Sequence, residues 1–81
     1  MRFGTETKLQ PADVVRKARA FFGPDGELGL PELPAGVDSV TFGTETGHVT
    51  VQVTPHEGHT AVTVLSREYD RQAEQFIREI G

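Results

Sequence analysis

Residues 37–65, VDSVTFGTETGHVTVQVTPHEGHTAVTVL, decide the fold. Valine alternates with a polar residue or alanine over 48–54 and over 60–65, which is the period of a strand with one buried face. Turn-forming residues interrupt the pattern at 44–47 and at 55–58. We therefore predict three antiparallel strands, over 37–42, 48–54 and 60–65, that are joined as a meander.

The lengths of the two turns set the predicted register of these strands. Four-residue turns place Phe42 opposite Val49 and Val51 opposite Val62. Both turns independently bring the valines of neighbouring strands to the same side, which is therefore the expected core side of the sheet.

The opposite side of the meander is polar but carries no charge. It is formed by Ser39, Thr41, Thr50, Gln52, Thr54, Ala61 and Thr63. One interpretation is a solvated face, because antiparallel sheets commonly face water on one side. The other is an interaction surface, because the charges that usually discourage association are missing. The candidate residues of that surface are Thr41, Thr50, Gln52 and Thr63.

Two amphipathic helices flank the meander in the sequence. The first is predicted over 11–22, with Pro11 at the first helical position and Gly23 at the end. The second is predicted over 68–80, with Ser66 as its N-cap. Apolar residues recur at helical spacing on both: Val14, Val15, Ala18, Phe21 and Phe22 on the first, and Tyr69, Ala73, Phe76, Ile77 and Ile80 on the second.

Two further strands complete the prediction. Residues 2–9 alternate as a strand, and residues 28–33, inside a segment rich in glycine and proline, are either a short edge strand or a loop. The predicted fold class is α+β, a single two-layer domain over residues 1–81. Its antiparallel sheet has four or five strands with both helices on one face, in the order β-α-(β)-β-β-β-α.

Composition excludes several classes of function. The chain has 81 residues, no cysteine and a net charge of −4, so we expect no disulfide, no thiolate metal site and no binding of nucleic acid through phosphate contacts. No run of 18 apolar residues is present, and residues 1–5 show no apolar leader, so we expect neither a membrane span nor secretion. The expected location is the cytoplasm.

Groups capable of catalysis or metal binding are sparse. His56, Glu57 and His59 are the one cluster of metal-ligand residue types, and their position in a turn with proline and glycine favours a polar hairpin over a zinc site. Ser39 and Ser66 have no predictable histidine or aspartate partner. We expect no enzymatic activity, no bound metal and no cofactor.

The ends of the chain resemble a known superfamily. Residues 3–23, FGTETKLQPADVVRKARAFFG, resemble the opening strand and proline-led helix of the START-like helix-grip domains, which share the β-α-β4-α order of the TATA-box-binding-protein-like fold. Residues 58–80, GHTAVTVLSREYDRQAEQFIREI, resemble their closing strand and C-terminal helix. The extra strands and the second short helix that enclose a cavity in those domains have no counterpart here.

Two hypotheses of function follow. The first is an interaction domain that binds a second copy of itself, as a homodimer, or another protein. The second, implied by the resemblance, is a shortened helix-grip domain that binds a small apolar ligand between the sheet and the last helix. The residues that would surround this ligand are Phe21, Phe22, Phe42, Tyr69 and Phe76.

Overall fold

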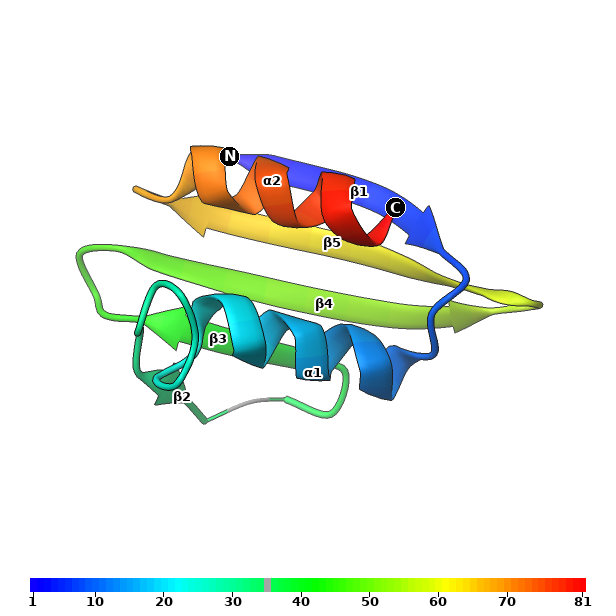
Figure 1. Cartoon of the computed structure of the whole chain (residues 1–81), viewed down its shortest axis with the longest axis horizontal. Coiled ribbons are helices and arrows are strands. Elements are labelled where there is room, and N and C mark those ends of the chain that lie inside the picture. Colours follow the sequence, from blue (N-terminus) through cyan, green and yellow to red (C-terminus); the bar gives the residue numbers. More distant parts are fainter. Residues whose placement is uncertain (35) are drawn as a thin grey trace.

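The computed structural model describes residues 1–34 and 36–81 and shows a sheet with two helices (Figure 1). In chain order the elements are β1 (Arg2–Thr7), α1 (Pro11–Phe22), β2 (Glu32–Leu33), β3 (Ser39–Gly43), β4 (His48–His56), β5 (His59–Arg67) and α2 (Asp70–Ile80). The predicted α+β class and element order are confirmed, and the optional edge strand is present as β2.

The sheet has five strands in the order β1-β5-β4-β3-β2, and every neighbouring pair is antiparallel. The first strand therefore lies beside the last one, so that the N-terminal strand and the C-terminal helix are found at the same edge of the sheet (Figure 1). Both helices lie on the same face of the sheet, α2 over β1 and β5 and α1 over the β3 and β4 side. This gives the two-layer arrangement expected from two helices and a sheet that each have one apolar side.

The core lies between the sheet and the helices. The alternation of β4 buries Val49, Val51 and Val53, while Thr50 and Gln52 between them face the other way. The remaining buried apolar side chains are Val14, Ala18, Phe21, Phe22, Val40, Phe42, Val62, Val64, Ala73, Phe76 and Ile80. The strand and helix periods read from the sequence thus select the core correctly.

The second hairpin differs from its prediction. Strands β4 and β5 extend to His56 and His59, which pair with each other across a two-residue loop of Glu57 and Gly58. The loop is possible because Gly58 has φ = 75°, in the left-handed region. As a result Val51 pairs with Val64 rather than with Val62.

The register error is two residues, which is one full period of a strand. Side chains therefore stay on their predicted faces although each one meets a different partner. The first hairpin follows its prediction, with Phe42 opposite Val49 and a hydrogen bond from the Thr44 amide to the Gly47 carbonyl.

Helix α2 begins two residues later than predicted. Ser66 is part of β5, and its hydroxyl accepts a hydrogen bond from the backbone N–H of Tyr69 at 3.2 Å without being the helix N-cap, which is Tyr69. Between them Glu68 has φ = 77°, a left-handed conformation unusual for a residue with a side chain. Pairing of Ser66 with Met1 keeps the strand extended and moves the helix start downstream.

Residues 28–33 combine the two alternatives that the sequence leaves open, a short edge strand and a loop. Of residues 28–33, Glu32 and Leu33 pair with β3, and the Pro31 carbonyl accepts a hydrogen bond from the Gly43 amide at 2.8 Å. The amides of Leu28 and Leu30 instead donate to the carbonyls of Phe21 and Phe22 at 3.0 and 2.9 Å. These bonds satisfy groups that the end of α1 leaves free.

The outer strands also differ at their ends. Strand β1 stops at Thr7, two residues before its predicted end. Strand β3 starts at Ser39 rather than at residue 37, and Val37 is fully exposed.

An ion pair ties β2 to the first helix. The Arg19 guanidinium donates to both carboxylate oxygens of Glu32, at 2.9 and 3.1 Å. The hydrogen bonds and the negative charge of Glu32 raise the pKa of the Arg19 side chain. Strand β2 is thus held in place by its backbone pairing with β3 and by the ion pair between its Glu32 side chain and Arg19 of α1.

Candidate interaction surface

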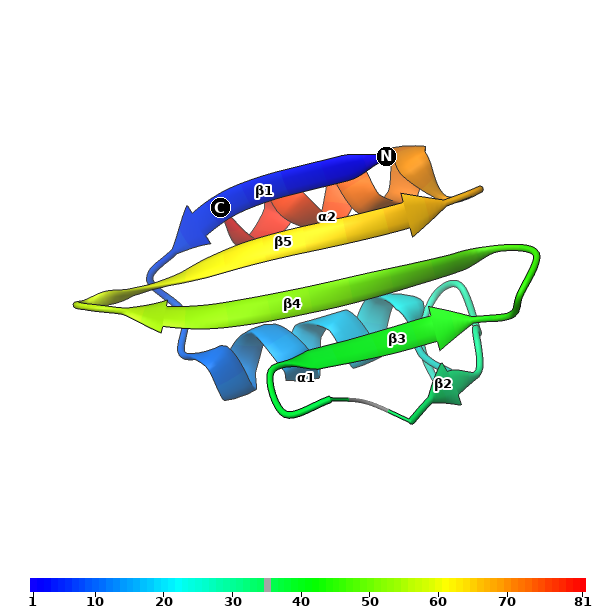
Figure 2. The same cartoon turned by 180° about the vertical axis from the view of Figure 1, so that it is seen from behind.

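The face of the sheet opposite the helices is the candidate surface, and we call it the open face (Figure 2). Within the described residues no helix covers it. The structure brings the four predicted residues together there, because Thr41 pairs with Thr50 and Gln52 pairs with Thr63 on adjacent strands. The hydroxyl oxygens of Thr41 and Thr50 are 2.9 Å apart and share a hydrogen bond.

Two leucines, absent from the predicted set, also belong to the open face. Leu65 lies between Thr50 and Arg2 in the cross-strand row, and Leu33 pairs with Thr41 at the far edge. Leu33 is 39% exposed. Leu65 could have been found from the sequence, since it continues the alternation of Ala61 and Thr63 on the same side. Leu33 depended on the formation of β2, which the sequence left open.

Charged and titratable residues border the open face at its two ends and along β1, where Arg2 pairs with Leu65 and Glu6 pairs with Ala61. Arg67 pairs with His48 at one end, and His59 pairs with His56 at the other. Between them lies an uncharged band across the inner strands, composed of Ser39, Thr41, Thr50, Gln52, Thr54, Ala61, Thr63 and Leu65. Because these residues are hydroxyls, an amide and small apolar groups, the band can leave water without desolvating an ion.

The histidine hairpin takes a different arrangement from a metal site. The rings of His56 and His59 stack with their centres 5.3 Å apart, and His59 Nε2 contacts the Glu6 carboxylate on the neighbouring strand. Glu57 lies in the loop beyond them. Among residues 1–34 and 36–81, no three histidine, aspartate or glutamate side chains are grouped closely enough to hold a metal ion.

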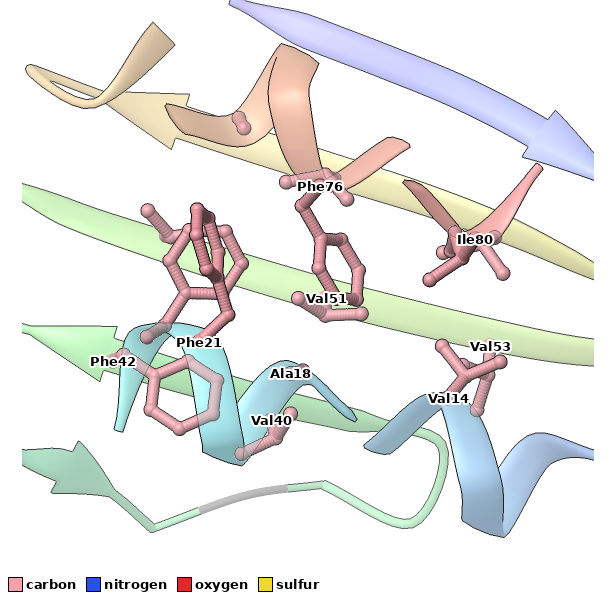
Figure 3. Close-up of a cluster of buried hydrophobic side chains, with 14 residues drawn as sticks. Val14, Ala18, Phe21, Val40, Phe42, Val51, Val53, Phe76 and Ile80 are labelled. Carbon is pink, nitrogen blue, oxygen red and sulfur yellow. The ribbon is translucent and has the colours of Figure 1, made fainter. Parts of the chain in front are cut away.

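The aromatic residues predicted to surround a ligand lie in the core. Phe22 is the central ring, with its centre 4.8 Å from Phe21, 5.3 Å from Phe76 and 5.9 Å from Phe42. Figure 3 shows Phe21, Phe42 and Phe76 between the sheet and the helices. Tyr69 is half-buried at the start of α2. The rings thus pack on one another, and a ligand among them stays a prediction.

Two depressions lie near this core. One, of about 660 Å³, is found where the end of β1 meets Lys17 of α1 and Ile80 of α2, and none of the five predicted ligand residues lines it. A smaller one, of about 210 Å³, lies between the helices and is bordered by Phe21 and Phe76.

Comparison with known proteins adds no relative. No family model, no curated protein and no solved structure matches the chain. In the described part of the chain, neither helix has the length and apolar character needed to cross a membrane.

Proposed function

We propose that this chain is a cytoplasmic interaction domain that binds a second copy of itself through the open face. The observation that carries the proposal is the uncharged band on a sheet face that neither helix covers. Charges are depleted from the cores of protein interfaces, as they are from this band.

The chemistry of the band favours an identical partner. Threonine hydroxyls and the Gln52 amide each donate and accept hydrogen bonds, so a surface built from them is complementary to a copy of itself. Leu65, on β5 at the border of the band with Arg2, is half-buried in the isolated chain and loses its remaining contact with water when another sheet packs on it. Two sheets that pack face to face would bring these side chains together at a spacing of about 10 Å.

The size of the band sets the expected strength. Three strands about 4.8 Å apart and about five residues of uncharged length, at about 3.4 Å each, give a band of roughly 14 by 17 Å. That is about 240 Å² in projection, below the roughly 800 Å² per partner of a standard interface. We therefore expect a weak dimer, with dissociation in the micromolar range or above.

The test is the molar mass in solution by light scattering as concentration is raised. The wild-type mass should rise from 8.9 kDa toward twice that value. Thr50→Lys and Thr63→Lys should each lower the mass that the chain reaches at a given concentration below that of the wild type, because each places a charge inside the band. The matched control is Gln75→Lys on α2, which adds the same charge to an exposed helix position and should leave the dimer intact.

Two results would contradict the proposal. One is a wild-type mass that stays at 8.9 kDa up to millimolar concentration. The other is a rise of mass with concentration that neither threonine substitution reduces, which would assign all association to a different surface.

A further inference from the structure

The two edges of the sheet are built differently. The β2 edge has only two strand residues, and Pro31 and Pro34 on either side have no N–H to donate. Short strands and proline are common devices that prevent a further strand from joining. The β1 edge, in contrast, has six residues without proline, and none of the described residues pairs with its outer side.

The alternation of hydrogen bonds along an antiparallel pair identifies the backbone N–H and C=O groups of β1 that β5 leaves free. Met1 and Ser66 exchange both backbone bonds, with the Ser66 amide donating to the Met1 carbonyl at 2.8 Å and the Met1 nitrogen donating to the Ser66 carbonyl at 2.7 Å. In an antiparallel ladder such pairs alternate with pairs whose groups point away. The N–H and C=O groups of Arg2, Gly4 and Glu6 therefore point outward from the sheet.

These three residues form a self-complementary edge. Arg2 and Glu6 have opposite charges and lie at equal distances on either side of Gly4. We propose that β1 pairs antiparallel with β1 of a second copy, with Gly4 opposite Gly4 and Arg2 of each copy opposite Glu6 of the other. This register uses all the outward groups and adds about six backbone hydrogen bonds.

Side chains select this register over its neighbours. A shift by two residues in one direction places Arg2 opposite Lys8 of the other copy, and larger shifts place Arg2 or Glu6 opposite its own counterpart. Like charges directly opposite are unfavourable in a sheet, whereas opposite charges are favourable. A shift by two residues in the other direction places Arg2 opposite Gly4 and loses a hydrogen-bonded pair. On the helix side, Phe3 is partly exposed and would gain Thr5 of the other copy as its cross-strand neighbour.

This interface goes beyond the proposed function, because it uses the backbone edge of β1 rather than the open face. The two-fold axis of such a pair is perpendicular to the sheet, so the helices of both copies lie on one side. The product is a continuous sheet of about ten strands whose two open faces form one surface.

Disulfide trapping tests the register. The chain has no cysteine, so any disulfide in a single-cysteine variant joins two copies. In Gly4→Cys the paired Cα atoms would be about 5.5 Å apart, within the range of a disulfide. The new Cβ is tolerated, since its nearest neighbour is the Val62 carbonyl oxygen at 3.7 Å.

Two matched variants give the comparison. Thr63→Cys is on the same face, in the strand position directly beside Gly4, but in an edge pair its copies would be about 14 Å apart, three strand spacings, and could not be joined. Adding Arg2→Glu to Gly4→Cys should slow trapping about tenfold, and adding Glu6→Arg as well should restore it. Adding Thr50→Lys instead should leave trapping unchanged, which separates the edge from the open face.

The proposal is overturned if Gly4→Cys forms its disulfide no faster than Thr63→Cys. It is also overturned if the addition of Arg2→Glu leaves the rate of disulfide formation unchanged. Hydrogen exchange of the wild-type chain provides an independent readout without a substitution. The amides of Arg2, Gly4 and Glu6 should exchange at least about tenfold more slowly at a protein concentration at which the chain is dimeric than at one at which it is monomeric. Exchange of these amides that is independent of concentration would count equally against the pairing.

Discussion

The substitution Phe22→Ala tests whether the cluster of phenylalanine rings is a tightly packed core. The side chain is fully buried, and three other phenylalanine rings have their centres within 6 Å of its own. Removal of such a ring costs about 3–5 kcal/mol, through lost transfer free energy and the cavity left behind. A chain of this length has a total stability of only about 4–12 kcal/mol. The substitution should therefore remove a large share of the free energy of unfolding.

Urea unfolding followed by far-ultraviolet circular dichroism gives the value directly, and the melting temperature should fall by at least about 12 °C. Leu33→Ala is the control, because Leu33 is exposed on the open face and surface substitutions usually change stability by about 0.5 kcal/mol or less. A cost below about 1 kcal/mol for Phe22→Ala would refute the packed core. It would favour instead the hypothesis of a ligand among the rings.

Two further predictions concern backbone conformation and use the same unfolding assay. Gly43→Ala should lower the free energy of unfolding by at least about 3 kcal/mol, because φ is 120° there and a Cβ would lie 2.3 Å from the Gly47 carbonyl oxygen. Gly58→Ala should lower it by only about 1 kcal/mol, because φ is 75° there and no atom lies within 4 Å of the new Cβ. Equal costs at the two positions would show that the backbone clash at Gly43 is absent. Glu68→Gly should raise the free energy of unfolding by about 1 kcal/mol, since Glu68 has a left-handed φ of 77° that glycine adopts without strain. A loss of stability in this variant would contradict the assigned backbone conformation.

The parts of the fold predicted correctly are those set by local periodicity. Alternation in β4 and β5 and the apolar stripes of the two helices each depend on residues a few positions apart, so the buried valines and phenylalanines could be identified from the sequence. The shared face of Thr41, Thr50, Gln52 and Thr63 follows from the same alternation, because a register error of two residues leaves faces unchanged.

The parts predicted wrongly depend on contacts between distant residues. The amphipathic stretch after Ser66 favours a helix cap at that residue, but Met1, 65 residues away, pairs with it and extends β5. The loop of Glu57 and Gly58 is a local exception, since Pro55 favours a turn over four residues, whereas in the structure Pro55 and His56 continue β4. Leu28 and Leu30 alternate as in a strand, yet their amides bond to the end of α1. Local patterns contain no information about these partners.

The outward groups of β1 required the structure for the same reason. The sequence alone contains Arg2, Gly4 and Glu6 at two-residue spacing, but it does not place β1 at an edge. Only the pairing of β1 with β5 shows which backbone groups remain free.

The most direct test of self-association through the open face is an isotope-filtered nuclear Overhauser experiment on an equal mixture of ¹³C-labelled and unlabelled wild-type chains. Contacts between copies should arise from the Leu65 methyl groups and from the threonine methyl groups of the band, with Thr50 and Thr63 among them. Contacts that arise only from the helices, or no contacts between copies at millimolar concentration, would contradict the proposed function.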